Sequence, residues 1–148
     1  MKKILFVCLG NICRSPMAEY IFKYLVEKRG LASDFYVESK ATSREEEGNP
    51  IYPPAQAVLR KNGIPFDKRG AKQISLSDYQ NFDYIICMDS RNFTRLKSVF
   101  DDNQGKIYKL LSFLGDSGDI LDPWYTGDFD TCFEQIYNSC NALLKTLI

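Results

Sequence analysis

A cysteine and an arginine near the start of the chain stand at a spacing that suits chemistry on an oxyanion. Cys8 ends an apolar run, and Arg14 follows after five residues, directly before Ser15 and Pro16. A loop that runs from a strand into a helix N-terminus can turn backbone N–H groups inward, where the helix dipole adds partial positive charge. Arg14 can also donate to two oxygens of a phosphate. The predicted phosphate-binding loop contains Leu9, Gly10, Asn11, Ile12, Cys13, Arg14 and Ser15.

Cys8 is the candidate nucleophile of this loop. Nearby arginines and helix N-termini favour the thiolate form of cysteine near neutral pH, and the chain has no histidine that could act as a base. The Ser15 hydroxyl can donate to the sulfur, and Asn11 can hold the loop by bonding to polar groups such as Ser39. Gly10 is expected to adopt a backbone conformation that a Cβ would block. The alternative is that Cys8 only packs at a strand end, as free cysteines often do.

Asp122 is the candidate general acid. Attack of a thiolate on an aryl phosphate expels an oxygen that needs a proton, and Asp122 precedes a stiff proline and two aromatic residues, Trp124 and Tyr125. A carboxyl group that faces a phosphate among aromatic rings can stay partly protonated because of desolvation and like charge. The same carboxylate would then act as base on the water that hydrolyses phosphocysteine. Trp124 and Tyr125 can form one wall for a flat ring, although Asp-Pro-Trp is also typical of a turn.

Apolar strands alternate with amphipathic helices along the chain. Short β-branched and aromatic runs predict strands, and apolar residues at helical spacing predict helices. The first helix is expected to have Ser15 as its N-cap and to end at Gly30. The predicted strands are residues 3–7, 35–39, 82–88 and 106–111, and the predicted helices are residues 16–29, about 54–62, 90–100 and 133–147. The polar stretches 42–54, 63–73 and 112–129 predict loops.

This alternation predicts a single α/β domain over residues 1–148. Its four-stranded parallel sheet would be covered by helices on both faces, giving three layers. Ligands of such sheets bind at the carboxyl ends of the strands, at a topological switch point. Cys8, Ser39, Asp89 and the loop after Leu111 would all lie at that edge.

Bulk composition excludes several classes of partner. Nineteen basic and nineteen acidic side chains cancel, so no overall charge draws the protein to nucleic acid or to an anionic membrane. The apolar run after Lys3 is too short for a signal peptide, and no stretch is long enough to span a membrane. Five cysteines without framework spacing argue against a disulfide scaffold. The lack of histidine and of Cys-x-x-Cys pairs argues against a metal site.

The segment from Val7 to Glu19 resembles the signature of the low-molecular-weight protein tyrosine phosphatases. Residues 38–43 (ESKATS), 82–89 (FDYIICMD) and 122–125 (DPWY) are similar to further segments of that family and occur in the expected order. The resemblance covers nearly the whole chain. It implies a flavodoxin-like fold, no metal or organic cofactor, phosphotyrosine-containing protein substrates and inorganic phosphate as product.

The resemblance also implies roles for individual residues. Cys8 would be the nucleophile, Arg14 the phosphate clamp, and Asp122 the general acid and base. Cys13 matches a second loop cysteine that can trap oxidised Cys8 as a reversible disulfide, which suits a thiol beside an oxidisable thiolate; alternatively, Cys13 only packs under the loop. Three residues match the hydrogen-bond network that supports the loop: Asn11, Ser15 and Ser39.

The chain departs from the family pattern at three places. Many relatives have a histidine in the segment around Lys68 and Arg69, tied into the loop network, so another residue or water must take that role here. Trp124 stands where a tyrosine is usual, which keeps ring stacking but removes a hydroxyl. The acidic run 44–47 replaces a segment that often has an aromatic residue, and its simplest interpretation is a solvated turn; if it faces the cleft instead, it would disfavour acidic residues beside a phosphotyrosine. The expected substrate slot contains Ile12, Glu45, Glu46, Trp124 and Tyr125.

Three alternative functions remain open. A phosphoarginine phosphatase is one, because some relatives have that activity, but they tend to have a smaller polar residue in place of Ile12. An arsenate reductase would need further cysteines to relay a disulfide, and only Cys87 lies near the required region. A phosphate-binding or redox-sensing module without catalysis would be expected to lack one of the catalytic residues. We expect a cytoplasmic protein that is mostly monomeric, with weak self-association conceivable.

Overall fold

The computed structural model describes all residues, 1–148, and contains one sheet of four strands. Its strands are β1 (Lys2–Cys8), β2 (Phe35–Ala41), β3 (Tyr84–Cys87) and β4 (Ile107–Lys109). Its α-helices are α1 (Arg14–Lys28), α2 (Pro53–Lys61), α3 (Leu76–Asn81), α4 (Ser90–Val99), α5 (Pro123–Thr126) and α6 (Phe129–Leu147). Short 3₁₀ helices cover Ala32–Asp34 and Leu110–Leu114. None of the helices combines the length and the hydropathy that a membrane span requires.

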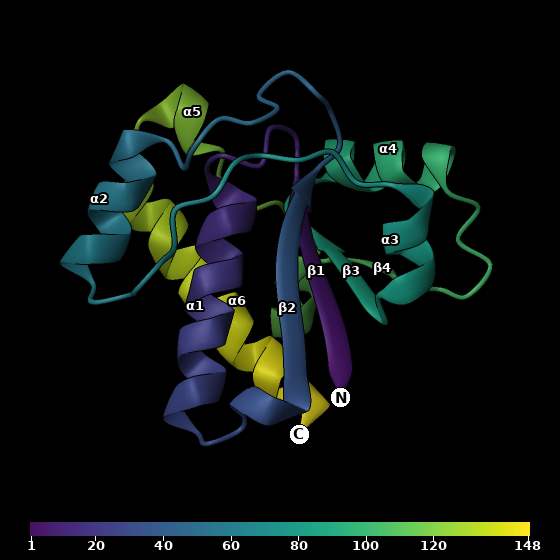
Figure 1. The fold of residues 1–148 in the computed structure, drawn as a ribbon, viewed down its shortest axis with the longest axis horizontal. Helices are drawn as coiled ribbons and strands as arrows, with labels where there is room; N and C mark the ends of the chain where they lie inside the picture. Colours follow the sequence, from purple (N-terminus) through teal and green to yellow (C-terminus); the bar gives the residue numbers. More distant parts are fainter.

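The sheet is entirely parallel, with the strand order β2-β1-β3-β4. Cys8 at the end of β1 lies opposite Ala41 of β2, and Val7 lies opposite Cys87 of β3. Strand order reverses beside β1, because β2 lies on one side of it and β3 on the other. The carboxyl ends of these strands meet at the upper edge of the sheet in Figure 1. The predicted four-stranded parallel sheet is confirmed.

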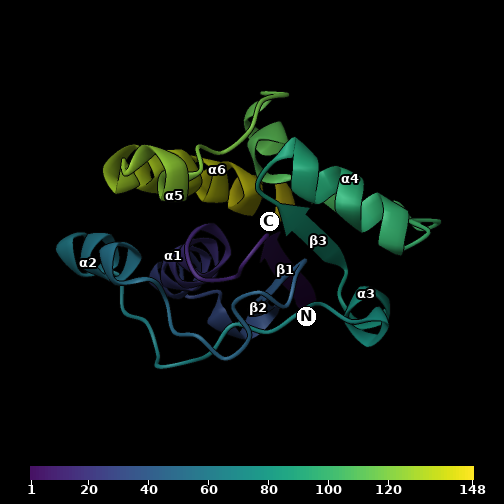
Figure 2. The same ribbon diagram turned by 90° about the horizontal axis from the view of Figure 1, so that it is seen from above.

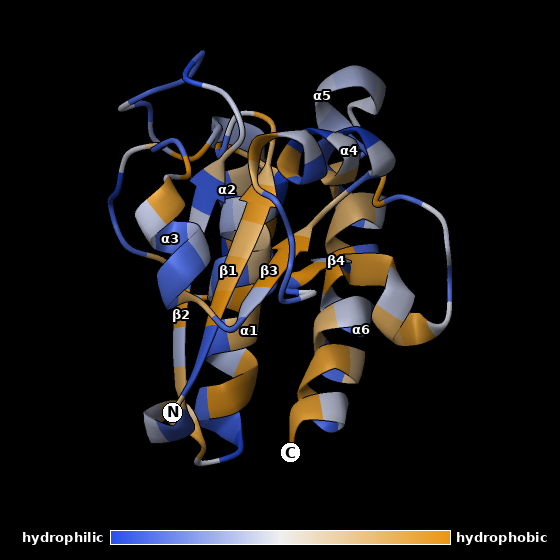
Figure 3. Ribbon diagram, turned by 90° about the vertical axis from the view of Figure 1, so that its right-hand side faces the viewer, coloured by the Kyte–Doolittle hydropathy of each residue, from blue (hydrophilic) through white to orange (hydrophobic).

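Helices cover both faces of the sheet and enclose two hydrophobic cores. Side chains alternate along β1, so Ile4 and Phe6 face one side while Leu5 and Val7 face the other. Ile4 and Phe6 pack with α1, α2 and α6, whereas Leu5 and Val7 pack with α3 and α4 in a smaller core. Figure 2 shows this layering from above, and Figure 3 shows that β3 and all but the start of β1 are mostly hydrophobic. The three-layer α/β arrangement is confirmed.

The first helix begins at Arg14 rather than at Pro16, and Ser15 is not its N-cap. Cys13 occupies the N-cap position, and no side chain caps the helix. Ser15 is fully buried in the first turn, where its hydroxyl bonds within the loop instead. The end of the helix is as expected, since Gly30 follows it with a φ of +69°, which glycine adopts without strain.

Short helical segments are the part of the fold that the sequence pattern did not predict. α3 has six residues, of which only Tyr79 is buried, so it shows no apolar periodicity. It begins with a capping box in which Ser75 and Asp78 bond to each other's backbone N–H groups, a signal that could have located it. α5 lies inside the predicted loop 112–129, and α6 starts at Phe129, four residues before the expected residue 133.

Candidate active site

The loop between β1 and α1 wraps around the sulfur of Cys8. Three protein groups lie within hydrogen-bond distance of Cys8 Sγ: the Ser15 hydroxyl at 3.0 Å, the Asn11 N–H at 3.3 Å and the Ser15 N–H at 3.4 Å. Cys8 is only 4% exposed, so the protein rather than water solvates the sulfur. Hydrogen-bond donors on several sides of a buried sulfur stabilise its anionic form.

Five further backbone N–H groups of the loop have no acceptor within the protein. They belong to Leu9, Gly10, Ile12, Cys13 and Arg14. Backbone N–H groups inside proteins are almost always paired, and unpaired ones in a loop before a helix form an anion-binding concavity. All five residues line the pocket above Cys8. The loop therefore offers a ring of donors to an anion that reaches the sulfur.

Asn11 gives the loop its curvature. It is the one non-glycine residue with a positive φ, +58°, in the left-handed region that asparagine tolerates better than most residues. Gly10 was expected to need such a conformation, and this is wrong, because its φ is not positive. A Cβ at Gly10 would instead lie 3.2 Å from Cγ of Glu46. The glycine therefore admits a close approach of the turn that follows β2.

A chain of hydrogen bonds runs from the loop into the protein. Asn11 Nδ2 donates to Ser15 Oγ at 2.7 Å and to Ser39 Oγ at 3.0 Å. Ser39 Oγ donates to Glu19 Oε1 at 2.6 Å, and Lys23 Nζ donates to Glu19 Oε2 at 2.6 Å. The expected contact of Asn11 with Ser39 is thus present. Glu19, to which the sequence pattern gave no role, anchors the network from the second turn of α1.

Arg69 reaches the loop from the segment in which the family resemblance leads us to expect a histidine. Its Nη2 donates to Asn11 Oδ1, and the N–H of Lys72 donates to the same oxygen at 3.3 Å. The Nη1 of Arg69 is buried and has no hydrogen-bond partner. Burial lowers the pKa of Arg69, while nearby anionic groups oppose that shift. A cation behind Asn11 therefore orients the amide and adds positive potential beneath the loop.

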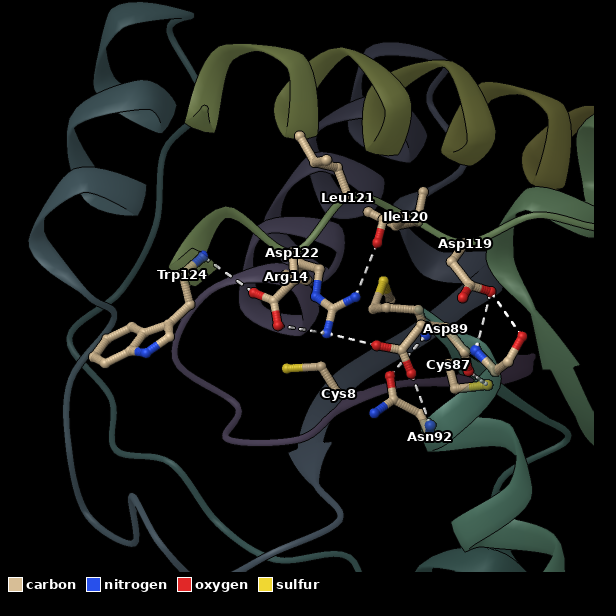
Figure 4. A network of polar contacts seen from close by, with 12 residues as sticks. Cys8, Arg14, Cys87, Asp89, Asn92, Asp119, Ile120, Leu121, Asp122 and Trp124 are labelled. Carbon is tan, nitrogen blue, oxygen red and sulfur yellow. Dashed lines mark hydrogen bonds and ion pairs between the residues drawn. The ribbon is translucent and has the colours of Figure 1, made fainter. Parts of the chain in front are cut away.

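The guanidinium of Arg14 is held in place by three groups of the protein. Its Nη1 donates to the carbonyl oxygen of Ile120 at 3.0 Å, and its Nη2 lies 2.9 Å from Asp89 Oδ2 and 3.4 Å from Asp122 Oδ2. Figure 4 shows the guanidinium between the two carboxylates, above Cys8. Burial alone would lower the pKa of Arg14, but the surrounding negative charges, that of Cys8 above all, outweigh burial and raise it.

Asp122 approaches the site from the loop before α5. It is the N-cap of that helix, and its Oδ1 accepts from the N–H of Trp124 at 3.1 Å. Pro123 occupies the first turn of α5, where a proline is tolerated. The Asp122 side chain is 30% exposed and lines the pocket above Cys8, so both the pocket and solvent reach it.

A pocket of about 170 Å³ opens over Cys8 and Arg14. Trp124 and Tyr125 are 54% and 77% exposed on its wall, so a ring entering the pocket would cover apolar surface of both. The acidic run is an exposed turn, as expected, and two of its glutamates also line the pocket. All five residues of the expected slot line the pocket: Ile12, Glu45, Glu46, Trp124 and Tyr125.

Tyr52 is an aromatic neighbour of the site that the sequence pattern did not identify. Its ring centroid lies 4.9 Å from that of Trp124 and 6.1 Å from that of Phe129. Its backbone N–H donates to the carbonyl of Ile12 at 2.8 Å, which fixes the segment before α2 against the loop. Trp124 is therefore supported from behind, although its outer face is exposed.

The other cysteines are free and buried. Burial raises the pKa of Cys13, and the negative charge of Cys8 adds to that shift. Burial likewise raises the pKa values of Cys87 and Cys132 to about 12. These thiols are therefore protonated at neutral pH. Cys8 differs from them because several hydrogen-bond donors lie around its sulfur.

The site consists of a buried cysteine in a loop between a strand and a helix, with an arginine and an aspartate beside it. Sites of this class are suited to hold an oxyanion next to the cysteine sulfur. Comparison with known proteins makes the class specific. Residues 3–148 match the family described as low molecular weight phosphotyrosine protein phosphatase, and the chain belongs to this family. The resemblance noted in the sequence is thereby confirmed.

Individual relatives cover the chain from end to end. The low molecular weight protein-tyrosine-phosphatase YfkJ of Bacillus subtilis is 43% identical over 150 residues, which span 99% of this chain and 96% of the relative. Its crystal structure superposes with a TM-score of 0.95, over 99% of this chain and 94% of that one. PtpA of Staphylococcus epidermidis is 40% identical over 149 residues, 100% of this chain and 95% of the relative.

A third relative has a different described activity. The crystal structure described as DARP, drosophila arginine phosphatase, is 35% identical to this chain. It superposes with a TM-score of 0.89 over 99% of this chain and 98% of that one.

Proposed function

We propose that this protein hydrolyses phosphotyrosine in protein substrates by a two-step mechanism through Cys8. In the first step Cys8 Sγ attacks phosphorus, the S–P bond forms as the P–O bond to tyrosine breaks, and Asp122 gives its proton to the leaving oxygen. In the second step water attacks phosphocysteine, Asp122 accepts the proton, and inorganic phosphate leaves. The observation that carries the proposal is the ring of unpaired N–H groups around a sulfur that has two N–H groups and a hydroxyl within hydrogen-bond distance.

The loop and Arg14 would stabilise the transferred phosphoryl group. The equatorial oxygens of that group carry charge in the transition state, and donors fixed in advance need no reorganisation to meet it. Arg14 is fixed by the Ile120 carbonyl and by Asp89, so a bound phosphate would displace only its long 3.4 Å contact with Asp122. Displacement would free the Asp122 carboxyl for proton transfer.

Ser15 would serve the sulfur in both steps. Its hydroxyl lies 3.0 Å from Cys8 Sγ and accepts from Asn11 Nδ2 at 2.7 Å, so its own proton is directed to the sulfur. That proton stabilises the thiolate before attack and again when sulfur leaves phosphorus. Asn11, Ser39 and Arg69 would act through Ser15, as positioning residues.

The pocket supports phosphotyrosine as the substrate, and the drosophila relative motivates a second candidate, phosphoarginine. Ile12 lines the pocket and is 9% exposed, so its bulk stands beside the phosphate site. A flat ring would stack on Trp124 and Tyr125. Comparing kcat/KM for matched phosphotyrosine and phosphoarginine peptides decides the question, and faster turnover of the phosphoarginine peptide would overturn the phosphotyrosine assignment.

Arsenate reduction on the same fold finds less support. It requires a cysteine that can relay a disulfide to the surface, and Cys87 is completely buried in the core between the sheet and α4. Its raised pKa also leaves it protonated at neutral pH.

Reversible oxidation of Cys8 is a further part of the proposal. A peroxide would convert the Cys8 thiolate to a sulfenic acid, and the Cys13 thiol would condense with it to form a disulfide and release water. Both cysteines line the same pocket. Peroxide inactivation should then be reversed by a thiol reductant in the wild type and not in Cys13→Ala. Equal recovery of the two proteins would contradict a role for Cys13.

The remaining expectations concern the molecule's surroundings. A zero formal charge and the absence of a membrane-spanning helix fit a protein that works in the cytoplasm on phosphoproteins. A mostly monomeric state stays a prediction, which sedimentation would test.

The test of the proposed function is turnover of p-nitrophenyl phosphate in the presence of a chelator. We expect the reduced wild type to be active and Cys8→Ser to lose roughly 10⁴-fold or more in kcat, as nucleophile removal does in other covalent enzymes. Cys140→Ser is the matched control, because Cys140 lies in the core near the Ala18 carbonyl, where a hydroxyl can be accommodated. An inactive wild type, or an active Cys8→Ser, would overturn the proposal.

A further inference from the structure

A second pocket adjoins the catalytic one along α4. It has a volume of about 840 Å³, and Leu9, Arg14, Asp122 and Tyr125 belong to the walls of both pockets. On its other side it is bounded by the first turns of α4, which begin beside Arg14 at Asp89 (Figure 4). A substrate chain that places one residue over Cys8 would therefore run past α4 with a neighbouring residue.

Arg91 and Arg95 face this second pocket from α4. They lie four residues apart, on the same side of the helix, and both are exposed. Both also line a shallower depression together with three hydroxyl residues of the helix, Ser90, Thr94 and Ser98. Guanidinium groups next to hydroxyl donors are a suitable surface for a phosphate or a carboxylate.

Most acidic side chains around this pocket already form an ion pair with a basic side chain of the protein. Asp89 pairs with Arg14 at 2.9 Å and caps α4 by accepting from the Asn92 N–H at 2.8 Å. Asp119 pairs with Lys109 at 2.8 Å. Asp122 contacts Arg14 at 3.4 Å, as described above.

Arg91 and Arg95, in contrast, form no ion pair with any carboxylate of the protein. Two like charges one turn apart destabilise a helix slightly, and an anion between them would relieve that repulsion. Glu45 is also without an ion-pair partner and lies on the wall of both pockets. An acidic group of the substrate would be repelled near Glu45 and attracted toward α4.

We propose that Arg91 and Arg95 form a subsite for a second anionic group of the substrate. The preferred substrate would be a phosphopeptide in which an acidic residue or a second phosphorylated residue lies close to the phosphotyrosine. This inference rests on the proposed function, because the phosphotyrosine must occupy the pocket over Cys8. It adds a specificity determinant that acts on peptides and not on small aryl phosphates.

The experiment compares three forms of one phosphotyrosine peptide. The first has neutral residues on both sides of the phosphotyrosine, the second has a glutamate next to it, and the third has a phosphoserine next to it. The glutamate and the phosphoserine are each tested on the N-terminal and on the C-terminal side. The enzymes are the wild type, Arg91→Gln, Arg95→Gln and the double variant. Arg29→Gln is the matched control, because Arg29 is an exposed arginine after the C-terminal end of α1, at the opposite end of the molecule from the loop. Turnover of p-nitrophenyl phosphate, which has no second anion, normalises each enzyme.

For the wild type we expect the anionic peptides to have a higher kcat/KM than the neutral peptide because their KM is lower. This difference in kcat/KM should shrink as salt is added. Each substitution should reduce that advantage by about two- to fivefold, the range of exposed ion pairs. Arg29→Gln should retain it. A larger advantage for phosphoserine than for glutamate would identify a second phosphate as the better ligand.

Two results would overturn the inference. One is a wild type that turns over the neutral and the anionic peptides equally, and the other is a preference that survives in the double variant. Neither result touches the proposed function, since p-nitrophenyl phosphate and the neutral peptide report on Cys8 alone. If neither of those two substrates is turned over, the proposed function itself has failed.

Discussion

A thiolate and a phosphate dianion repel each other, so a site that brings them together must surround both with positive partial charge. This chain does so without any histidine. Cys8 Sγ accepts from two backbone N–H groups and lies 3.0 Å from a hydroxyl, and five more N–H groups stand unpaired around the pocket. Arg14 and Arg69 add a full charge on either side of the loop. At the scale of residues, the proposed catalysis would depend on donors that are fixed before the substrate binds.

Asp122→Asn tests the general acid. The variant keeps the helix cap, because an asparagine oxygen can also accept from the Trp124 N–H, but it cannot donate an acidic proton. We expect kcat/KM to fall by about 10²-fold for phenyl phosphates with poor leaving groups and much less for those with good ones. The measurement is kcat/KM over a series of phenols of increasing pKa. A slope equal to that of the wild type would show that Asp122 does not protonate the leaving oxygen.

Arg69→Gln tests the cation behind the loop. Loss of a charge-assisted hydrogen bond to Asn11 should misorient the amide and lower kcat by roughly tenfold, with KM changing less. Arg69→Lys, which keeps a positive charge, should recover part of the loss. The rate at which iodoacetate alkylates Cys8 gives a second measure, and it should fall in Arg69→Gln and be unchanged in the control Arg29→Gln. Equal alkylation rates in all variants would assign Arg69 a purely structural role.

Elements position these residues, and the sequence predicted the longer elements well. β1, the loop and α1 are visible as an apolar run, a polar turn and an amphipathic repeat, since each buries many residues in one pattern. The assignment of Ser15 as an N-cap failed because tertiary contacts, not helix capping, determine where its hydroxyl points. α3 and α5 bury almost nothing, so periodicity could not show them.

The site was predictable to a similar extent. The residues that touch the sulfur and those proposed to bind the phosphate lie together in the sequence, which is why Cys8, Arg14 and their loop could be recognised. Arg69 and Tyr52 were missed because they reach the loop from distant segments. Glu19 lies within the motif, but its contacts with Ser39 and Lys23 depend on how β2 packs against α1. No pattern local to the sequence encodes such contacts.

Asp89 links α4 to Arg14, and its substitution tests the helix cap in that link. Its carboxylate caps α4 through the Asn92 N–H and pairs with Arg14. Asp89→Ala removes both contacts, whereas Asp89→Asn keeps the cap. We expect the alanine variant to have a free energy of unfolding about 1 kcal/mol lower than that of the asparagine variant, the usual value of an N-cap. Urea unfolding measures the difference, and equal stabilities would show that the cap contributes nothing.

At the scale of the whole molecule, Asp102 joins three segments of the smaller core. Its side chain is 2% exposed and accepts from the Tyr79 hydroxyl at 2.6 Å and the Lys106 N–H at 2.8 Å, while Lys97 Nζ lies 3.2 Å away. Burial alone would raise the pKa of Asp102, but these hydrogen bonds outweigh it and lower the pKa. A carboxyl group whose pKa is lower in the folded than in the unfolded state stabilises the fold at every pH at which it is ionised.

The pH dependence of stability follows from that sign. The contribution of Asp102 should be fully present above its unfolded-state pKa of about 3.9 and be lost as the pH falls through the lower folded-state pKa. Urea unfolding between about pH 6 and pH 3 should show a steeper loss of stability in the wild type than in Asp102→Asn. Asp130→Asn, at an exposed surface ion pair, is the control and should follow the wild type. Parallel curves for the wild type and Asp102→Asn would contradict the assignment.

The central claim is that the phosphoryl group passes through Cys8, and direct capture of that intermediate tests it. Asp122→Ala should slow the hydrolysis of phosphocysteine, while p-nitrophenyl phosphate, with its good leaving group, still forms it. We would mix the two, denature within the first turnover, and measure the mass of the peptide that contains Cys8. The account predicts one added phosphoryl group on that peptide, absent from Cys8→Ser. An unmodified Cys8 peptide during continuing turnover, or a phosphoryl group on another residue, would contradict it.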